Sequence, residues 1–314
     1  MARWTAADIP NLAERWAVVT GANSGLGFQT ALELARHGAA VVLACRDQVR
    51  GDAALRRLRS LAPGATLELA TLDLADLASV RRFAEQYAST HAKLDLLVNN
   101  AGVMAIPQRR TVDGFEMQFG TNHLGHFALT GRLFPLLAST PAARIVTVSS
   151  NAHRSGKIDF HDLQRERSYS PWGAYGQSKL ANLLFTFELQ RRIDAAGLDL
   201  RSVAAHPGFA ATNLMVVGPR MGGHPLQERL FRAATRLIAQ SDARGALPTL
   251  YAATAADVVG GAYYGPDGLG QQRGYPKRVS STAQANDEDA AQRLWQVSEA
   301  LTGVRYEILD AAVA

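Results

Sequence analysis

Short apolar runs alternate with longer helical patterns along most of the chain. The runs are rich in β-branched residues and several are continuously apolar, which is typical of strands covered on both faces of a sheet. The longer segments are bounded by turn and cap signals, as helices are. The pattern predicts strands over 16–20, 39–45, 66–74, 94–100, 144–150, 200–208 and 261–265, and helices over 26–36, 47–61, 76–91, 114–139 and 175–196.

Strand–helix alternation of this kind predicts an α/β protein with a doubly wound, seven-stranded parallel sheet and helices on both faces. No linker, repeat or low-complexity tract divides the chain, so we expect 1–314 to be a single domain with its core at about 14–265. Residues 209–245 break the alternation and are expected to form a loop and helix that cover a ligand site. Residues 266–314 are expected to pack across the sheet edge or an oligomer interface.

Composition narrows the class of protein without naming a function. The chain is 47% hydrophobic and 19% charged, with a net charge of +5, a weak basic excess that does not indicate a nucleic-acid partner. Cys45 is the single cysteine, so no internal disulfide forms. No apolar run approaches the ~20 residues that cross a bilayer, and the N-terminus lacks the apolar centre of a signal peptide. We therefore predict a cytoplasmic protein without an integral membrane segment.

A Gly-rich turn, TGANSGLG at 20–27, separates the first predicted strand from the first helix. A doubly wound sheet binds a dinucleotide at this turn, because the helix N-terminus presents N–H groups and a partial positive charge to the diphosphate. Glycine lets the backbone approach closely and accepts positive φ. The alternative is a purely structural turn. The predicted cofactor-binding residues here are Gly21, Asn23, Ser24, Gly25, Leu26 and Gly27.

Further motifs follow in order: NNAG at 99–102, a serine pair at 149–150, YGQSK at 175–179 and HPGFAAT at 206–212. With the Gly-rich turn they resemble the short-chain dehydrogenase/reductase family over about residues 14–265. The segments LACRD, FGTNHLGHF and SKLANLLFTFEL resemble its retinol dehydrogenase-like branch. The resemblance implies a Rossmann fold and hydride transfer between a nicotinamide cofactor and an alcohol or carbonyl carbon.

Tyr175 and Lys179 are four residues apart and share one face of a helix. A nearby ammonium can lower the pKa of a tyrosine, ordinarily ~10, by about 1–3, so Tyr175 is expected to act as general base in oxidation and general acid in reduction. Taken alone, such a pair is more often an ordinary surface pair.

The resemblance implies that Lys179 also binds the nicotinamide ribose, that Ser150 hydrogen-bonds the substrate oxygen, and that Asn122 kinks its helix and holds a water near the lysine. The long connection 151–174 is expected to shape a wall of the substrate cleft.

The end of the second strand bears on which nicotinamide cofactor is used. An acidic residue there would bind the ribose 2′-hydroxyl, but this strand ends LACRD, with Arg46 first. A guanidinium pairs well with phosphate, so we predict a preference for NADP(H), with NAD(H) possible. In the alternative, Asp47 caps the next helix and Arg46 is merely solvated. By resemblance, the remaining cofactor-binding residues are Asp73, Leu74, Asn99, Ala101, Gly102, Pro207, Gly208 and Thr212.

Other features bear on partners. His123 and His126 in HLGH have no third ligand at a sensible spacing, so they are interpreted as core or cleft histidines and no metal is expected. The predicted helix 175–196, which carries Tyr175 and Lys179, is apolar on more than one side. This predicts a homodimer or homotetramer, as in the family. The alternative is that the chain's own C-terminal segment covers it.

The expected substrate is a small apolar alcohol or carbonyl compound, because residues 209–240 are rich in Leu, Met, Phe and Val. Two other functions stay open at this point. One is a non-catalytic NADP(H)-binding regulatory or scaffold protein, and the other is an acyl-carrier ketoreductase.

Overall fold

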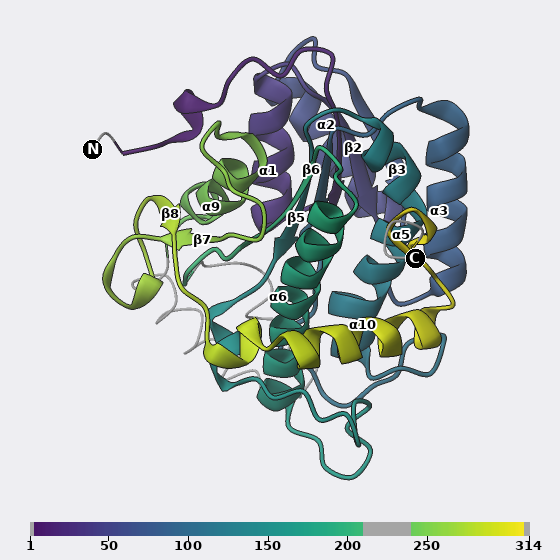
Figure 1. Ribbon diagram of the computed structural model, residues 1–314. Coiled ribbons are helices and arrows are strands. Elements are labelled where there is room, and N and C mark those ends of the chain that lie inside the picture. Colours follow the sequence, from purple (N-terminus) through teal and green to yellow (C-terminus); the bar gives the residue numbers. More distant parts are fainter. Residues whose placement is uncertain (1–2, 210–239, 311–314) are drawn as a thin grey trace.

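The computed structural model describes residues 3–209 and 240–310, and within these ranges eight strands form one sheet (Figure 1). The strand order is β3-β2-β1-β4-β5-β6-β7-β8, and every pairing is parallel except that of β7 with β8. The strands are β1 Trp16–Thr20, β2 Ala40–Cys45, β3 Leu67–Thr71, β4 Leu96–Asn99, β5 Ala143–Val148, β6 Leu200–Ala205, β7 Tyr263–Pro266 and β8 Pro276–Arg278.

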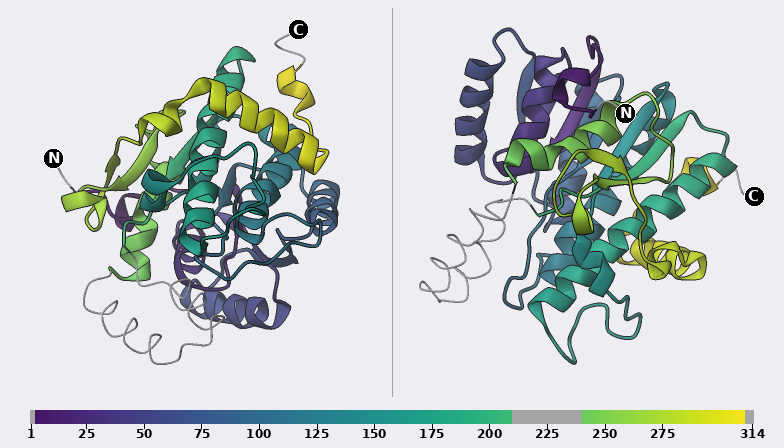
Figure 2. Two further views of the ribbon diagram at one scale, coloured as in Figure 1. Left: turned by 90° about the horizontal axis from the view of Figure 1, so that it is seen from below. Right: turned by 90° about the vertical axis from the view of Figure 1, so that its left-hand side faces the viewer.

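Helices cover both faces of the sheet, as the alternation predicts (Figure 2). One buried apolar cluster joins α1, α2 and α9 to the sheet, and another joins α3, α5 and α6 to the opposite face. The helices are α1 Gly25–Arg36, α2 Gln48–Leu61, α3 Leu77–Thr90, α4 Met117–Phe119, α5 Gly125–Ser139, α6 Pro171–Ala195, α9 Asp242–Thr254, α10 Glu288–Thr302 and α11 Glu307–Asp310, with a π-helical turn η2 Gly120–Leu124 and 3-10 turns η1 Ala6–Asp8, η3 Asn151–Ser155, η4 Leu269–Gln271 and η5 Ala283–Asn286.

The predicted fold class is confirmed, with two differences in detail. The seven predicted strands are present, but the eighth, β8, was missed because a three-residue edge strand that begins with proline and continues with two charged residues has no strand pattern. The predicted helix 114–139 is α4, the π-helical turn η2 and α5 in succession. Its apolar pattern carries no mark of the change in winding.

The carboxyl ends of the parallel strands meet at one edge of the sheet, where open α/β sheets bind ligands. The loops that follow β1, β4, β5 and β6 all leave from this edge, so the motifs noted in the sequence are brought together there. Of the predicted cap over 209–245, only Phe209 and residues 240–245 lie within the described ranges. No helix of the described ranges is both long enough and apolar enough to cross a bilayer.

The C-terminal segment packs on α6, the helix that carries Tyr175 and Lys179, with α10 lying over it (Figure 1). The Trp295 ring is buried and stacks on Phe185 of α6, with ring centroids 6.0 Å apart. Beyond α10, the Tyr306 hydroxyl donates to the Phe127 carbonyl at 2.8 Å. The apolar face of α6 is therefore covered by the chain itself, which is the alternative to subunit pairing that the sequence left open.

Candidate active site

The turn between β1 and α1 has the geometry of an anion site. Gly21 and Gly25 have φ of +66° and +56°, in the left-handed region that favours glycine. A Cβ at Gly27 would lie 2.5 Å from the Gly21 carbonyl oxygen, so no side chain fits there. Ser24 occupies the N-cap of α1 without a side-chain cap bond, which leaves the first N–H groups of the helix to an outside acceptor. Among the other predicted residues of this turn, Asn23 and Leu26 are partly exposed.

The loop after β4 is tied to this turn through Asn100 rather than Asn99. The Asn100 side chain donates to the Thr20 carbonyl at 2.7 Å, and the N–H groups of Asn100 and Ala101 donate to the Thr20 hydroxyl at 2.9 Å each. The Asn99 side chain instead donates to Thr130 of α5 at 3.0 Å. Successive side chains of a strand point to opposite faces, so only one of the two asparagines can face the turn. Asn100, which the motif did not single out, makes this contact, and the role predicted for Asn99 beside the cofactor stays a prediction.

Asn122 lies in the π-helical turn and is fully buried. Its Oδ1 accepts from the Val103 N–H at 2.8 Å, and its Nδ2 donates to the Val103 carbonyl and to Ser178 Oγ, both at 2.9 Å. Gly102 packs closely against the Asn122 side chain, since a Cβ at Gly102 would lie 3.0 Å from Asn122 Oδ1 and 3.7 Å from Lys179 Nζ. Such π turns are rare and occur frequently at functional sites. The predicted irregularity of the helix at Asn122 is present.

Tyr175, Lys179 and Ser150 come together where β5 ends against α6. Lys179 Nζ donates to the Val148 carbonyl at 2.9 Å and lies 5.7 Å from the centroid of the Tyr175 ring. Ser150 Oγ accepts from the Ala152 N–H at 3.2 Å, and its side chain interacts with the Tyr175 hydroxyl. The neighbouring serine of the pair is buried and donates to the main chain of α6 instead. The role of Ser150 toward the substrate oxygen stays a prediction.

In the protein without cofactor, burial determines the protonation states of Tyr175 and Lys179. It raises the pKa of Tyr175 to about 12, which the Ser150 side chain only partly offsets. It lowers the pKa of Lys179 to about 8. The expectation that the ammonium would bring the tyrosine below its ordinary pKa is therefore wrong for the protein alone, because desolvation of the phenolate outweighs a cation 5.7 Å from the ring. The site holds a neutral phenol beside a readily deprotonated amine.

Arg46 and Asp47 follow β2, and their surroundings suit Arg46 as a phosphate ligand and Asp47 as a helix cap. Asp47 caps α2 by accepting from the Arg50 N–H at 3.0 Å, and its carboxylate lies 3.4 Å from the Arg50 guanidinium. Arg46 is exposed and makes no hydrogen bond or ion pair with any residue in the described ranges. The acidic residue is thus engaged in its own helix, while the Arg46 guanidinium is free to bind a ligand.

The other predicted cofactor residues line the same edge. Asp73 is half-buried, and one of its carboxylate oxygens accepts from the Ala75 N–H at 3.0 Å, while Leu74 next to it is buried. Gly208 has φ of +65°, and a Cβ there would lie 2.4 Å from the Gln272 carbonyl oxygen. Pro207 accepts at its carbonyl from the Gln240 side chain. Thr212 lies outside the described residues.

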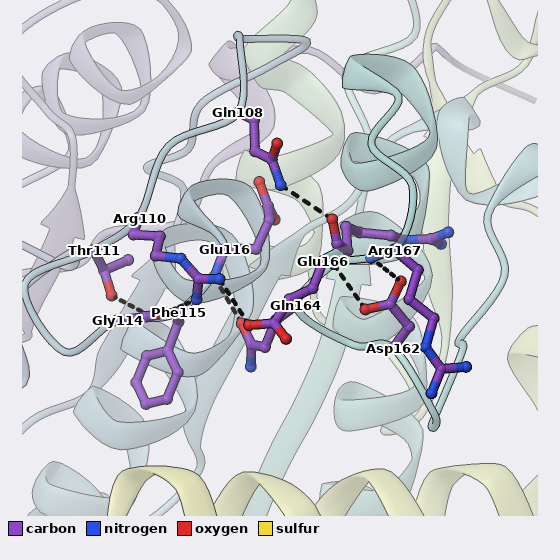
Figure 3. Close-up of polar contacts among 11 residues, drawn as sticks. Gln108, Arg110, Thr111, Gly114, Phe115, Glu116, Asp162, Gln164, Glu166 and Arg167 are labelled. Atoms are coloured by element: carbon purple, nitrogen blue, oxygen red, sulfur yellow. Dashed lines mark hydrogen bonds and ion pairs between the residues drawn. The ribbon is translucent and has the colours of Figure 1, made fainter.

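The long connection before α6 is fastened to the segment that precedes α4 (Figure 3). Arg110 forms an ion pair with Glu166 at 2.7 Å, and the Gln164 side chain accepts from the Glu116 N–H at 2.7 Å. The buried Glu116 carboxylate caps α4, and burial raises its pKa. Trp172, the second residue of α6, is 54% exposed, and its ring meets the Tyr175 ring edge-on with centroids 6.0 Å apart. The connection is therefore held against the segment before α4, and its predicted role as a wall of the substrate cleft stays a prediction.

Comparison with known proteins gives one family. The model of the family described as short chain dehydrogenase matches residues 15–218. Human (Homo sapiens) retinol dehydrogenase 13 is 43% identical over 292 residues, which cover 91% of this chain and 84% of that protein. Mouse (Mus musculus) retinol dehydrogenase 12 is 41% identical over 292 residues, covering 92% and 87%.

Solved structures agree. An uncharacterised protein from Mycobacterium paratuberculosis is 48% identical, with a TM-score of 0.80 over 97% of this chain and 99% of that one. A protein described as an NAD(P)-dependent gluconate 5-dehydrogenase from Beutenbergia cavernae, solved with bound NADP, is 26% identical, with a TM-score of 0.62 over 81% and 95%.

Proposed function

Since the chain belongs to the short-chain dehydrogenase family, in its retinol dehydrogenase-like branch, and is an NAD(P)-dependent enzyme that acts on CH–OH groups, we propose that it uses NADP(H) to interconvert an apolar alcohol and its aldehyde or ketone. One observation carries the proposal. Tyr175, Lys179, Ser150 and Asn122, far apart in the sequence, meet at the edge of the sheet where the Gly-rich turn lies.

The residues of this edge fit a nicotinamide dinucleotide. The glycine cradle and the uncapped N-terminus of α1 suit a diphosphate. The second carboxylate oxygen of Asp73, which has no hydrogen-bond partner among the described residues, suits the adenine amino group. The loop after β4 would hold a ribose, and Pro207 with Gly208 the carboxamide. The free guanidinium of Arg46 supports NADP(H) over NAD(H), because it can pair with a 2′-phosphate while Asp47 is engaged by α2.

When bound, the cofactor supplies the hydride acceptor or donor and, in its oxidised form, a positive charge. In reduction, the Tyr175 hydroxyl gives its proton to the substrate oxygen. In oxidation, Tyr175 first releases its proton to Lys179, and the resulting phenolate accepts the proton of the substrate hydroxyl. The Ser150 hydroxyl donates a hydrogen bond to the same oxygen as negative charge develops on it. After reduction, Lys179 restores the proton of Tyr175, since its lowered pKa of about 8 lets it gain and lose a proton near neutral pH. Asn122 holds the loop after β4 in place beside Lys179.

An apolar substrate is supported by the exposed Trp172 beside Tyr175 and by relatives that are named retinol dehydrogenases. An indole face in contact with water offers apolar area to a ligand at low entropic cost. A cytoplasmic location and a homodimer or homotetramer remain predictions. Because α10 covers the apolar face of α6, such an oligomer would need another surface.

The test is a screen of NADPH consumption with retinal, long-chain aldehydes, steroids and other ketones, using wild type and Tyr175→Phe. We expect turnover of apolar carbonyls by the wild type and a loss of about 100-fold or more in the variant, because the proton donor is gone. NADPH affinity, followed by its fluorescence, should be unchanged in the variant. Equal turnover by both proteins would contradict the proposed role of Tyr175, and NADPH binding without any turnover would favour a scaffold.

A further inference from the structure

The two histidines of HLGH are both buried, and neither takes part in the chemistry proposed above. His123 lies on the side of α10, with Nε2 2.8 Å from Ser298 Oγ. His126 lies on the side of the cofactor edge, with Nε2 3.0 Å from Thr20 Oγ1 and Nδ1 3.0 Å from the Asn122 carbonyl oxygen. Burial lowers the pKa of His123 to about 3 and that of His126 to about 4, so both rings are neutral at neutral pH.

The partners of His126 fix its tautomer. A carbonyl oxygen can only accept, so Nδ1 must carry the proton and donate it to Asn122. A neutral ring has no second N–H, so Nε2 must accept from the Thr20 hydroxyl. The alternative acceptor for that hydroxyl, the Val98 carbonyl, is more distant at 3.3 Å.

The hydrogen bonds continue beyond Thr20 in the same direction. Its oxygen accepts the N–H groups of Asn100 and Ala101 at 2.9 Å each, while its own proton goes to His126. The chain of bonds thus runs from the loop after β4, through the last residue of β1 and the imidazole, to the π-helical turn. Each end carries residues of the proposed site: Thr20 opens the Gly-rich turn, and the Asn122 side chain is bonded to Ser178 beside Lys179.

We propose that His126 is a positioning residue, which uses both ring nitrogens to hold the Asn122 turn in register with the cofactor-binding turn. The inference rests on the function proposed above. It assigns a role to a buried ring that touches neither substrate nor cofactor, and it explains why a polar side chain occupies a buried position between two such turns. An aliphatic side chain would leave the Asn122 carbonyl without the Nδ1 donor and the Thr20 hydroxyl without its shortest acceptor.

Two substitutions separate the two bonds. In His126→Gln, the side-chain oxygen replaces Nε2 and keeps the Thr20 bond, but the donor to Asn122 is lost. In His126→Asn, the amide nitrogen replaces Nδ1 and keeps the Asn122 bond, but the acceptor for Thr20 is lost. We expect kcat to fall about 10-fold in the glutamine variant with unchanged NADPH affinity, and the Kd for NADPH to rise about 10-fold in the asparagine variant, the effect of one unsatisfied buried partner.

His123→Gln is the matched control, because it removes a buried histidine of the π-helical turn whose ring bonds to Ser298 of α10 and not to the cofactor-binding turn. It should lower the thermal midpoint without moving kcat or the Kd for NADPH. If all three variants lose activity and affinity in the same proportion as stability, His126 is only a core residue and the proposal fails.

The tautomer tests the same inference in the unsubstituted protein, without any turnover. In a long-range ¹H–¹⁵N spectrum of ¹⁵N-histidine-labelled protein, the His126 signals, identified by their absence in His126→Asn, should show a protonated Nδ1 and a bare Nε2 that does not titrate near neutral pH. A protonated Nε2 would overturn the bond directions and the proposal. Should the wild type reduce no carbonyl compound, the proposed function fails, whereas the tautomer and the NADPH affinities still decide the role of His126.

Discussion

Replacing Lys179 by methionine should make the protein more stable at neutral pH while it abolishes turnover. Lys179 is 3% exposed, and burial lowers the pKa of its amine from 10.5 to about 8. That shift corresponds to a cost of about 3 kcal/mol for keeping the ammonium in the folded state. Methionine removes this cost and loses one hydrogen bond, worth about 1 kcal/mol. The Val148 carbonyl still accepts from Asn182 at 3.1 Å, so no partner is left unsatisfied. The net gain is about 2 kcal/mol.

The pH dependence identifies the cause of the gain. Unfolded chains keep the Lys179 proton up to about pH 10.5, whereas the folded protein releases it near pH 8, so between these values the unfolded state binds more protons. Wild-type stability therefore rises with pH in this window, and the cost is present in full below it. The advantage of Lys179→Met should fall from about 2 kcal/mol at about pH 6.5 to about zero at about pH 9.5.

The assay is equilibrium urea unfolding without cofactor, because a bound ligand would stabilise the folded state. The midpoint of Lys179→Met should exceed that of the wild type by about 0.5 M urea at the lower pH. Lys157→Met is the control, since this lysine is exposed and its side chain forms no hydrogen bond or ion pair with the described residues, and its midpoint should not move. A methionine variant that is less stable than the wild type, or whose advantage is the same at every pH, would refute the reasoning.

Three further predictions concern cofactor choice and the C-terminal segment. Arg46→Ala should raise the Kd for NADPH about 10-fold and leave that for NADH unchanged, because only the former has a 2′-phosphate; equal losses in fluorescence titrations would count against it. Asp47→Ala should cost about 1 kcal/mol in urea unfolding through loss of the α2 cap, with the NADPH to NADH affinity ratio preserved. Trp295→Ala should cost about 3–5 kcal/mol, as a large buried aromatic does, and unchanged thermal unfolding would show that α10 does not dock on α6.

The sequence is sufficient for the architecture because buried parallel strands have an unmistakable pattern. Continuous apolar runs such as 39–45 locate the inner strands, and the turn at 20–27 locates the ligand edge. Two elements are invisible to the same reasoning. The edge strand β8 is short and charged, and the π-helical turn at 120–124 inserts into an apolar pattern that continues unchanged.

The candidate site was predictable by motif but not in its electrostatics or its supporting contacts. Spacing places Lys179 near Tyr175, but only the burial of both reverses the expected pKa shift of the tyrosine. The doubled asparagine at 99–100 does not reveal which side chain faces the turn, because that depends on the register of β4. The partners of His126 lie 4 and 106 residues away, and no local pattern specifies the second.

The central claim, hydride transfer at the Tyr175 site, is tested most directly by following the hydride itself. Wild-type enzyme and Tyr175→Phe would each receive NADPH deuterated on one or the other face of the nicotinamide C4, together with the best carbonyl substrate from the screen, and the alcohol would be analysed by mass spectrometry. We predict one deuterium at the carbinol carbon from one of the two labelled cofactors with the wild type, and almost no alcohol with the variant. Alcohol that carries no deuterium from either cofactor, or equal labelled product from both proteins, would contradict the account.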